Sequence, residues 1–396
     1  MKPVELSQGV YWVGVIDWGI RSFHGLSTPQ GSTYNSYLIV DDKITLVDAV
    51  RAEQADELVE HIAAIVDPAK IAFVISNHSE PDHSGALSVI MEAAPNAELL
   101  ASKDGVKRLG HIYGQNWNML AVEDGEELDI GSRTLRFIYA PLLHWPETMV
   151  TYDPGGRILF SCDPFGAHVA TTERFADELG CGFVLGYTRK YFAYLIAAYR
   201  KAMNQALAKT DGLDIEIIAP SHGPVWRGKD NLELLTGSYR SWANLELEDK
   251  AVIIYASMWG GTSRMAYAVA EGVTEAGLDA RVFNVEHSDA SNIIAETFLS
   301  RLVLLGAPTF ESGIYPPVEA FIPFMRIPRD KNKKVGCFGS FGWGGGSVPK
   351  LTKMLEAEGY EVYQPGLTNR FFPGPDNLQE CRAFGKQAAE WAKGTE

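Results

Sequence analysis

Cysteine, long apolar runs and positive charge are all scarce in this chain of 396 residues. The four cysteines, Cys162, Cys181, Cys337 and Cys381, lie far apart and form no Cys-x-x-Cys pair. This spacing excludes a zinc finger and a disulfide framework. No apolar run of about 18 residues is present, and the first residues lack the apolar segment of a signal peptide. We therefore expect a cytoplasmic protein that does not span a membrane.

Lysine and arginine total 35 residues against 50 aspartates and glutamates, which gives a formal net charge of −15 at pH 7. Nucleic-acid binding depends on clustered positive side chains that contact phosphates. The charge balance therefore argues against a general nucleic-acid binder. An acidic surface can serve solubility alone, so it neither requires nor excludes a protein redox partner.

Two domains are expected, because a chain of this length exceeds what one hydrophobic core usually organises. Residues 241–250 turn polar and charged, and an apolar strand-like run follows at once. We place the boundary there, with one domain over residues 1–249 and another over residues 250–396. In the first domain, the pattern predicts a hairpin from residues 33–40 and 44–48, and helices over residues 53–66, 191–207 and 231–244.

Four potential metal ligands, His78, Glu80, Asp82 and His83, lie within six residues. Apolar residues 72–76 predict a strand before this loop, and residues 84–94 predict a helix after it. In an extended backbone the first three ligands alternate on one side, while His83 turns toward a second position at the helix start. This geometry suits two metal ions, although a polar loop can also contain two histidines and two acids by chance.

Three more candidate ligands follow later apolar runs: His144 after residues 135–140, Asp163 after residues 158–162, and His222 after residues 215–221. A carboxylate just past a buried strand is costly unless something compensates its charge. A position bridging two metal ions would compensate Asp163. The alternative is that Asp163-Pro164 is a simple turn.

This order of histidines and acids resembles the metallo-β-lactamase fold superfamily, whose binuclear sites use the pattern H-x-[HE]-x-D-H, a distant His, a bridging Asp and a last His. The resemblance covers residues 1–245 and implies an αββα sandwich. Hydrolytic members usually have a second histidine where this chain has Glu80, and they bind zinc. A carboxylate favours iron or manganese, so the site resembles a non-haem diiron centre.

The second domain alternates strand-like and helix-like segments. Strands are expected over residues 251–256, 280–285, 302–306, 334–338 and 360–363, and helices over 262–276, 291–299, 318–325, 348–359 and 377–392. Five strands alternating with helices predict a doubly wound parallel sheet, in which a ligand binds beyond the carboxyl ends of the strands.

Three loops converge at that edge of the sheet, and they supply small residues, hydroxyls and aromatic rings. The candidate residues are Ser257, Met258, Trp259, Gly260, Gly261 and Thr262; Pro308, Thr309, Phe310, Glu311 and Ser312; and Ser340, Phe341, Gly342, Trp343, Gly344 and Gly345. A helix N-terminus with hydroxyls suits a phosphate, and Trp259 or Trp343 suits a flat ring. No G-x-G-x-x-G follows the first strand, which favours a mononucleotide over a dinucleotide. The domain resembles a flavodoxin domain that binds FMN, although the first loop taken alone is also compatible with an ordinary glycine-rich turn.

The whole chain resembles the flavodiiron proteins, most closely the rubredoxin:oxygen oxidoreductases. That resemblance implies that His78, Glu80 and His144 bind one iron, that Asp82, His83 and His222 bind the other, and that Asp163 bridges them. It also places His24 beside the metal pocket, outside the ligand set. Many members have a tyrosine pair where this chain has Tyr191-Phe192, so the phenol beside the site is either absent or supplied by Tyr191. The middle flavin loop departs too, with Glu311-Ser312 where many relatives have Asn.

The activity implied by this resemblance is reduction of O2 to two waters, two electrons coming from the irons and two from reduced FMN. Coupling of two NO molecules to N2O and water is the other implied reaction. No cysteine-paired rubredoxin module precedes the end at Glu396, so an external donor is expected. The resemblance implies rubredoxin as this donor, with a reduced deazaflavin cofactor as the alternative. The resemblance further implies a head-to-tail homodimer or a dimer of dimers. A zinc hydrolase, and an electron carrier or gas sensor without catalysis, are the alternative functions.

Overall fold

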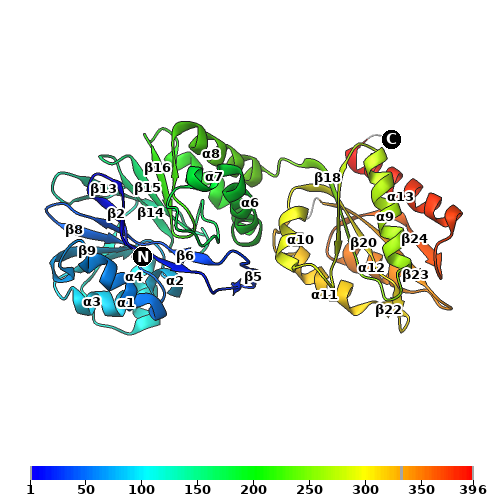
Figure 1. The fold of residues 1–396 in the computed structure, drawn as a ribbon, viewed down its shortest axis with the longest axis horizontal. Helices are drawn as coiled ribbons and strands as arrows, with labels where there is room; N and C mark the ends of the chain where they lie inside the picture. Colours follow the sequence, from blue (N-terminus) through cyan, green and yellow to red (C-terminus); the bar gives the residue numbers. More distant parts are fainter. Residues whose placement is uncertain (1, 331–332, 395–396) are drawn as a thin grey trace. The chain divides into compact units, whose positions relative to one another are not determined.

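The computed structural model describes residues 2–330 and 333–394, and the chain divides into two compact units between Asn244 and Leu245. In the first unit, two β-sheets pack face to face and helices cover both outer faces (Figure 1). This is the expected αββα sandwich. None of the helices in the described ranges has the length and apolar character needed to cross a membrane.

The first sheet of this unit is mixed, and its neighbours β8 to β11 are parallel. Its strand order is β1 (Val4–Ser7), β2 (Val10–Trp12), β7 (Tyr37–Ile39), β8 (Ile44–Val47), β9 (Ile71–Ser76), β10 (Glu98–Ser102) and β11 (Met119–Val122). The helices on its outer face are α1 (Ala55–Ala63), α3 (Leu87–Ala93) and α4 (Lys103–Tyr113).

The second sheet has the order β12 (Glu127–Asp129), β13 (Thr134–Tyr139), β14 (Met149–Asp153), β15 (Ile158–Cys162), β16 (Ile217–Pro220) and β17 (Trp226–Arg227). Its side chains alternate between two faces, as strand geometry requires. Phe137 and Phe160 point into the core between the sheets, where they meet Trp12 and Ile75 of the first sheet. Helices α6 (Cys181–Tyr191) and α7 (Arg200–Thr210) lie between β15 and β16 in the chain, and α8 (Lys229–Asn244) follows β17. All three lie on the side of this sheet in the unit (Figure 1).

Two expectations for the first unit need correction. The strand predicted over residues 33–40 is two strands, β6 (Ser32–Tyr34), which pairs with β3 (Val15–Asp17), and β7. The break falls at Asn35, because its Nδ2 donates to the carbonyls of Pro220 (2.6 Å) and Gly223 (2.9 Å). A tertiary contact therefore replaces a ladder bond.

The helix predicted over residues 191–207 was wrong at its start and in its continuity. Helix α6 begins at Cys181, and a π-helical segment (η3, Phe192–Ile196) and a 3-10 turn (η4, Ala197–Tyr199) separate it from α7. Single π-helical turns are often found at functional sites. Here the π-helical segment starts directly after Tyr191.

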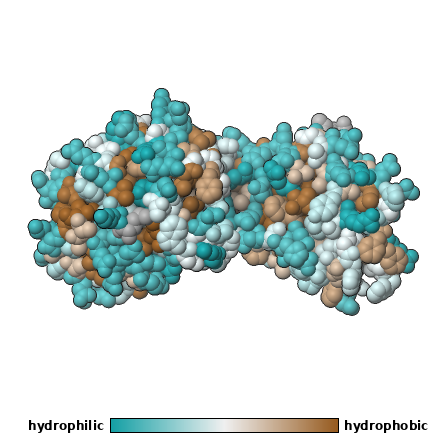
Figure 2. Space-filling view, viewed as in Figure 1, coloured by the Kyte–Doolittle hydropathy of each residue, from teal (hydrophilic) through white to brown (hydrophobic). Residues whose placement is uncertain are grey.

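The second unit is a five-stranded parallel sheet with the order β19 (Asp279–Asn284), β18 (Glu248–Tyr255), β20 (Ser300–Gly306), β23 (Lys334–Phe341) and β24 (Glu361–Arg370). Helices α9 (Gly261–Glu275) and α13 (Pro375–Lys393) cover one face, and α10 (Ala290–Thr297), α11 (Pro316–Met325) and α12 (Ser347–Ala357) cover the other. This confirms the doubly wound sheet and its alternating order. Within each unit, teal hydrophilic residues cover most of the visible surface, and brown hydrophobic residues form separate patches between them (Figure 2).

Candidate functional site

The ligand loop leaves the carboxyl end of β9 and enters the short helix α2 (Pro81–Ser84). Asp48, which follows β8, fixes the start of this loop. Its carboxylate accepts from the backbone N–H of Asn77 (2.8 Å) and from Asn77 Nδ2 (2.9 Å). Asp48 is buried and has φ 57°, a conformation that its short polar side chain tolerates. The buried carboxylate of Asp48 therefore fixes the position of the first residue of the ligand loop.

The predicted metal ligands gather in two groups. In the first group, Glu80 Oε2 lies 3.2 Å from His78 Nε2 and 3.0 Å from His144 Nε2. In the second group, Asp82 Oδ2 lies 3.2 Å from His83 Nε2 and 3.1 Å from His222 Nε2. The family resemblance implied this division, whereas the alternation expected of an extended backbone placed Asp82 on the side of His78 and Glu80.

Asp163 lies between the two groups. Its Oδ2 is 3.5 Å from His78 Nε2 and 3.6 Å from His144 Nε2. Its Oδ1 is 3.1 Å from His83 Nε2 and 3.7 Å from His222 Nε2. One carboxylate thus presents one oxygen to each group, which is the arrangement of a bridging ligand.

The donor atoms fit a pair of metal ions. Several buried atoms that point into the groups make no hydrogen bond within the described residues: both oxygens of Asp82, Asp163 Oδ2, and Nε2 of His83, His144 and His222. Buried polar atoms normally have partners. Imidazole and carboxylate groups together suit iron, and two such ions would satisfy these atoms.

In the metal-free protein, attraction between the ligand histidines and the neighbouring carboxylates shifts the pKa values of the histidines. Burial disfavours a charged His78, but hydrogen bonds to Glu147 and Glu80 raise its pKa to about 10. Burial likewise opposes a charged His83, but the charges of Asp82 and Asp163 raise its pKa to about 9. Both histidines are therefore protonated at neutral pH before metal binds.

Iron(II) loading should release about two protons per chain near pH 7, because a histidine must be deprotonated to bind metal. The apparent affinity should rise with pH and level off above the pKa values of about 9 and 10 of His83 and His78. Anaerobic calorimetry in buffers of different ionisation enthalpy measures the released protons. The variant His78→Gln should release about one proton fewer; an affinity independent of pH between 6 and 9 would contradict the assignment.

Two residues that the sequence did not indicate support this site. Glu147 is buried and accepts from His78 Nδ1 (2.9 Å) and from Ser79 Oγ (2.5 Å). Such a carboxylate fixes the tautomer and orientation of a ligating histidine. His168 is buried against His222 and Tyr191, with its Nδ1 2.8 Å from Ser32 Oγ. Only the tertiary fold brings these two residues to the metal ligands. For Glu147 the sequence does contain a weak signal of a functional role, since an acidic residue shortly before a buried strand is unusual.

His24 and Tyr191 both reach the ligand set. His24 Nε2 lies 2.9 Å from Glu80 Oε1; burial opposes its charged form, but the hydrogen bond to Glu80 raises its pKa above the ordinary value. The Tyr191 hydroxyl donates to Asp163 Oδ1 (2.7 Å), and burial raises its pKa well above the ordinary value. Phe192, by contrast, packs against Tyr239 and Trp242, away from the ligands.

The second unit has a pocket of about 150 Å³ beyond the carboxyl ends of its central strands. Predicted residues that line it are Ser257, Met258, Trp259, Gly261, Pro308, Thr309, Ser340, Phe341 and Gly342. The predicted residues outside its lining are Gly260, Thr262, Phe310, Glu311, Ser312, Trp343, Gly344 and Gly345, which belong to the same three loops. Two further lining residues, Phe371 and Phe372, follow β24 and were not predicted.

The loop chemistry of this pocket fits a phosphorylated flat ring. Gly261 begins helix α9 at the pocket, and an added Cβ there would approach Phe371 O and Ser340 Oγ to 3.3 Å. A helix N-terminus favours a phosphate. Ser257 Oγ accepts from the backbone N–H of Gly260 (3.0 Å), and Trp259 is 83% exposed. An aromatic ring so exposed is available to stack on a ligand.

Comparisons with known proteins agree with both halves of this description. Residues 33–223 match the family described as ODP family beta lactamase, and residues 253–385 match Flavodoxin. The nitric oxide reductase of Moorella thermoacetica is 38% identical over 394 residues, with 98% of each chain covered. The flavodiiron protein from Giardia intestinalis has a TM-score of 0.96 at 34% identity, covering 100% of this chain and 98% of that chain.

The rubredoxin oxygen:oxidoreductase from Desulfovibrio gigas has a TM-score of 0.94 at 32% identity, covering 100% of this chain and 99% of that chain. Fold and site together define a two-domain protein with a β-lactamase-like unit followed by a flavodoxin-like unit. More particularly, the chain belongs to the flavodiiron protein family. The fold class and the family expected from the sequence are both confirmed.

Proposed function

We propose that this protein is a flavodiiron oxidoreductase that reduces O2 to water, NO to N2O, or both. Residues 1–249 would hold two irons and residues 250–396 would hold FMN. The observation that carries the proposal is Asp163, whose two carboxylate oxygens face two separate groups of histidines and acids. A zinc hydrolase would leave the pocket in the second unit without a role, and it would not explain Glu80 among the ligands.

His78, Glu80 and His144 would bind one iron, and Asp82, His83 and His222 the other, with Asp163 shared. When bound, the irons and FMN supply the electrons that reduction of O2 or NO consumes. The protein must supply protons as well, since water is a product of both reactions. His24 is suited to that role because its Nε2, 2.9 Å from Glu80 Oε1, holds a proton beside the site.

Tyr191 has a different part in the proposal. Its pKa lies well above the ordinary value, so its hydroxyl stays protonated and donates a hydrogen bond to Asp163 Oδ1. This hydrogen bond fixes the orientation of the bridging carboxylate. Tyr191→Phe should therefore change the balance between the two metal positions rather than remove either ion.

The test is gas consumption by the anaerobically reduced protein, with O2 and NO followed electrochemically in separate runs. Iron, zinc and flavin are determined on the same sample. Turnover with about two irons and one FMN per chain supports the proposal and ranks the two gases. Zinc in place of iron, with neither gas consumed after iron reconstitution, overturns it in favour of a hydrolase.

An external electron donor is part of the proposal, and rubredoxin is the first candidate. The names of two relatives support this choice, a rubredoxin oxygen:oxidoreductase and a flavorubredoxin. We also propose a head-to-tail dimer, in which the flavin of one chain serves the irons of another. Reduction of the bound flavin by reduced rubredoxin, followed by absorbance, tests the donor, and sedimentation velocity tests the dimer.

Trp259→Ala should raise the Kd for FMN about tenfold, because it removes a ring that would stack on the flavin. Trp343→Ala is the matched control, since Trp343 is 94% exposed and lies outside the lining of the pocket. Quenching of flavin fluorescence during titration of the apoprotein gives both constants. A larger loss for the Trp343 variant would assign the stacking role to the other tryptophan.

A further inference from the structure

A small apolar cavity lies between the second sheet of the first unit and helix α7. Its volume is about 20 Å³, which is room for about one small molecule. The sheet contributes the outward-facing side chains of Ile138, Val150 and Leu159, and the helix contributes Met203 and Leu207. These side chains alternate with Phe137 and Phe160, which point into the core on the opposite face.

Neither side-chain hydroxyl group that lines the cavity has a free proton to donate to water. Its two lining hydroxyls are engaged elsewhere: Ser161 Oγ donates to Pro164 O (2.7 Å), and Thr210 Oγ1 lies 3.0 Å from Leu207 O. A cavity without polar partners stays dry and binds apolar guests such as xenon. O2 and NO are guests of the same kind, being small, uncharged and weakly polar.

The inner end of the cavity is next to the metal ligands in the chain. Leu143, Pro164 and Phe165 line it there. Leu143 directly precedes His144, and Pro164 directly follows Asp163. Leu143 and Phe165 are both buried, so this end is closed to bulk water.

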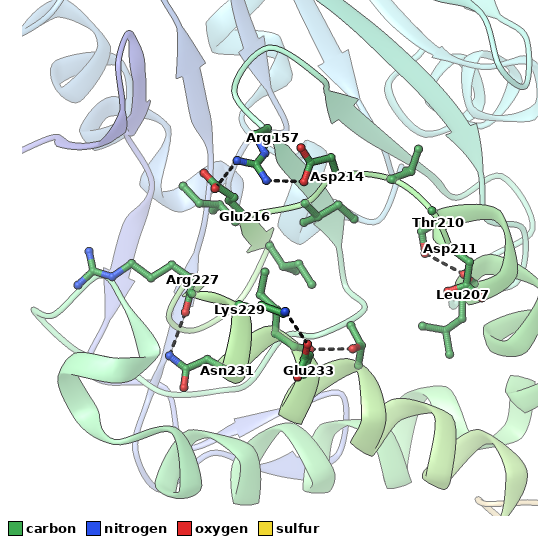
Figure 3. Close-up of a pocket in the computed structure, with 18 of the residues that line it drawn as sticks. Arg157, Leu207, Thr210, Asp211, Asp214, Glu216, Arg227, Lys229, Asn231 and Glu233 are labelled. Atoms are coloured by element: carbon green, nitrogen blue, oxygen red, sulfur yellow. Dashed lines mark hydrogen bonds and ion pairs between the residues drawn. The ribbon is translucent and has the colours of Figure 1, made fainter.

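The outer end meets an open cleft of about 850 Å³ on the surface of the same unit. Leu207 and Thr210, which line the cleft (Figure 3), also line the cavity. Elsewhere the cleft wall carries ion pairs, such as Arg157 with Asp214 and Glu216 (Figure 3). Leu207 and Thr210 therefore form the wall that separates the apolar cavity from the solvent-filled cleft.

A separate hollow is lined by two of the metal ligands, Glu80 and Asp82. Its volume is about 380 Å³, and His24 and Arg51 are among the other residues that line it. Charged and polar groups suit the passage of water and protons. The apolar cavity and this hollow thus differ in polarity.

We propose that the apolar cavity is a binding and entry site for the diatomic gas, separate from the polar hollow beside His24. The gas enters from the cleft at Leu207 and Thr210, occupies the cavity, and passes Leu143 and Phe165 to the metal site. This inference rests on the proposed function, which supplies the gas as substrate.

The first test is occupancy by xenon. Crystals of the wild-type protein under xenon pressure should contain one xenon atom between Leu159 and Met203, and those of Ala206→Phe should contain none. Ala206 lines the cavity, whereas Ala208 on the same helix is exposed and does not, so Ala208→Phe is the matched control and should retain xenon. Absence of xenon from the wild-type cavity overturns the proposal.

The second test is kinetic. Ala206→Phe should lower kcat/KM for O2 or NO about tenfold and leave kcat unchanged, because access is obstructed and the chemistry is not. Ala208→Phe should match the wild type. Ala206→Leu is a milder filling variant, and thermal unfolding with iron and flavin analysis verifies that each variant is folded and loaded. Equal kcat/KM in an Ala206 variant that has lost xenon overturns the route.

The outcomes separate the route from the proposed function. A wild type that consumes neither gas overturns the proposed function and the route together. A wild type that consumes gas but binds no xenon in the cavity overturns the route alone.

Discussion

Replacing Asp163 with asparagine should remove iron and abolish gas reduction while leaving FMN in place. Asp163 is buried and presents one carboxylate oxygen to each group of ligands. Asparagine has nearly the same shape, but it is neutral and it would present an N–H donor to one of the two ions. Loss of a residue that only supports a metal ligand already costs about 10- to 100-fold in affinity or activity. Loss of a ligand shared by two ions should lower metal affinity and activity by more than this factor.

Iron analysis, flavin content and the rate of gas consumption measure this prediction. We expect at most about one iron per chain and activity reduced by more than about 100-fold. Asp153→Asn is the matched control: Asp153 is also a buried aspartate of the second sheet, but it pairs with Arg133 (2.7 Å). That variant should lose stability and keep its iron. A fully loaded Asp163→Asn protein with near-normal turnover would rule out the bridging role.

Gly272→Ala should strongly destabilise the second unit. Gly272 lies on α9 where that helix crosses α13, and an added Cβ would lie 1.9 Å from the carbonyl oxygen of Arg382. Gly385 on α13 makes the reciprocal contact, with Val269 O at 2.1 Å. Because an added Cβ would meet backbone atoms, which cannot turn away as a side chain can, the two helices must move apart. Overpacking of this kind costs about 3 kcal/mol or more of unfolding free energy.

Thermal unfolding followed by flavin release and circular dichroism reports this change. Gly237→Ala in α8 is the control, because nothing lies within 4 Å of its added Cβ. That substitution should stabilise the chain by up to about 1 kcal/mol, as alanine is the better helix former. Equal melting temperatures for the Gly272 variant and the wild type would show that the crossing can relax.

The metal ligands were predictable because their residue types carry the chemistry and each follows an apolar strand. The strand before His78 belongs to the first sheet, and the strands before His144, Asp163 and His222 belong to the second sheet. The four residues converge because these strand ends lie at the same edge of the two-sheet sandwich. The alternation of the second unit was predictable for a similar reason, since buried parallel strands and amphipathic helices leave strong local patterns.

What the sequence could not predict depends on contacts between distant segments. Glu147, His168 and Phe371 acquire their places only when remote elements pack together. The break at Asn35 has the same origin, because its partners Pro220 and Gly223 lie far along the chain. The π-helical turn after Tyr191 has no periodicity signature of its own, so an uninterrupted helix was expected there.

Each metal position has one histidine that a hydrogen bond fixes through its Nδ1 atom and one that none fixes among the described residues. His78 Nδ1 donates to the carboxylate of Glu147 (2.9 Å), and His222 Nδ1 to the carbonyl of Thr33 (2.7 Å). Nδ1 of His83, in contrast, makes no hydrogen bond within the described residues. A histidine without such support turns more freely, so the ion that it binds exchanges faster. Because each position pairs one fixed histidine with one less constrained histidine, we expect the two ions to exchange at similar rates and the centre to yield heterobimetallic forms when iron is scarce.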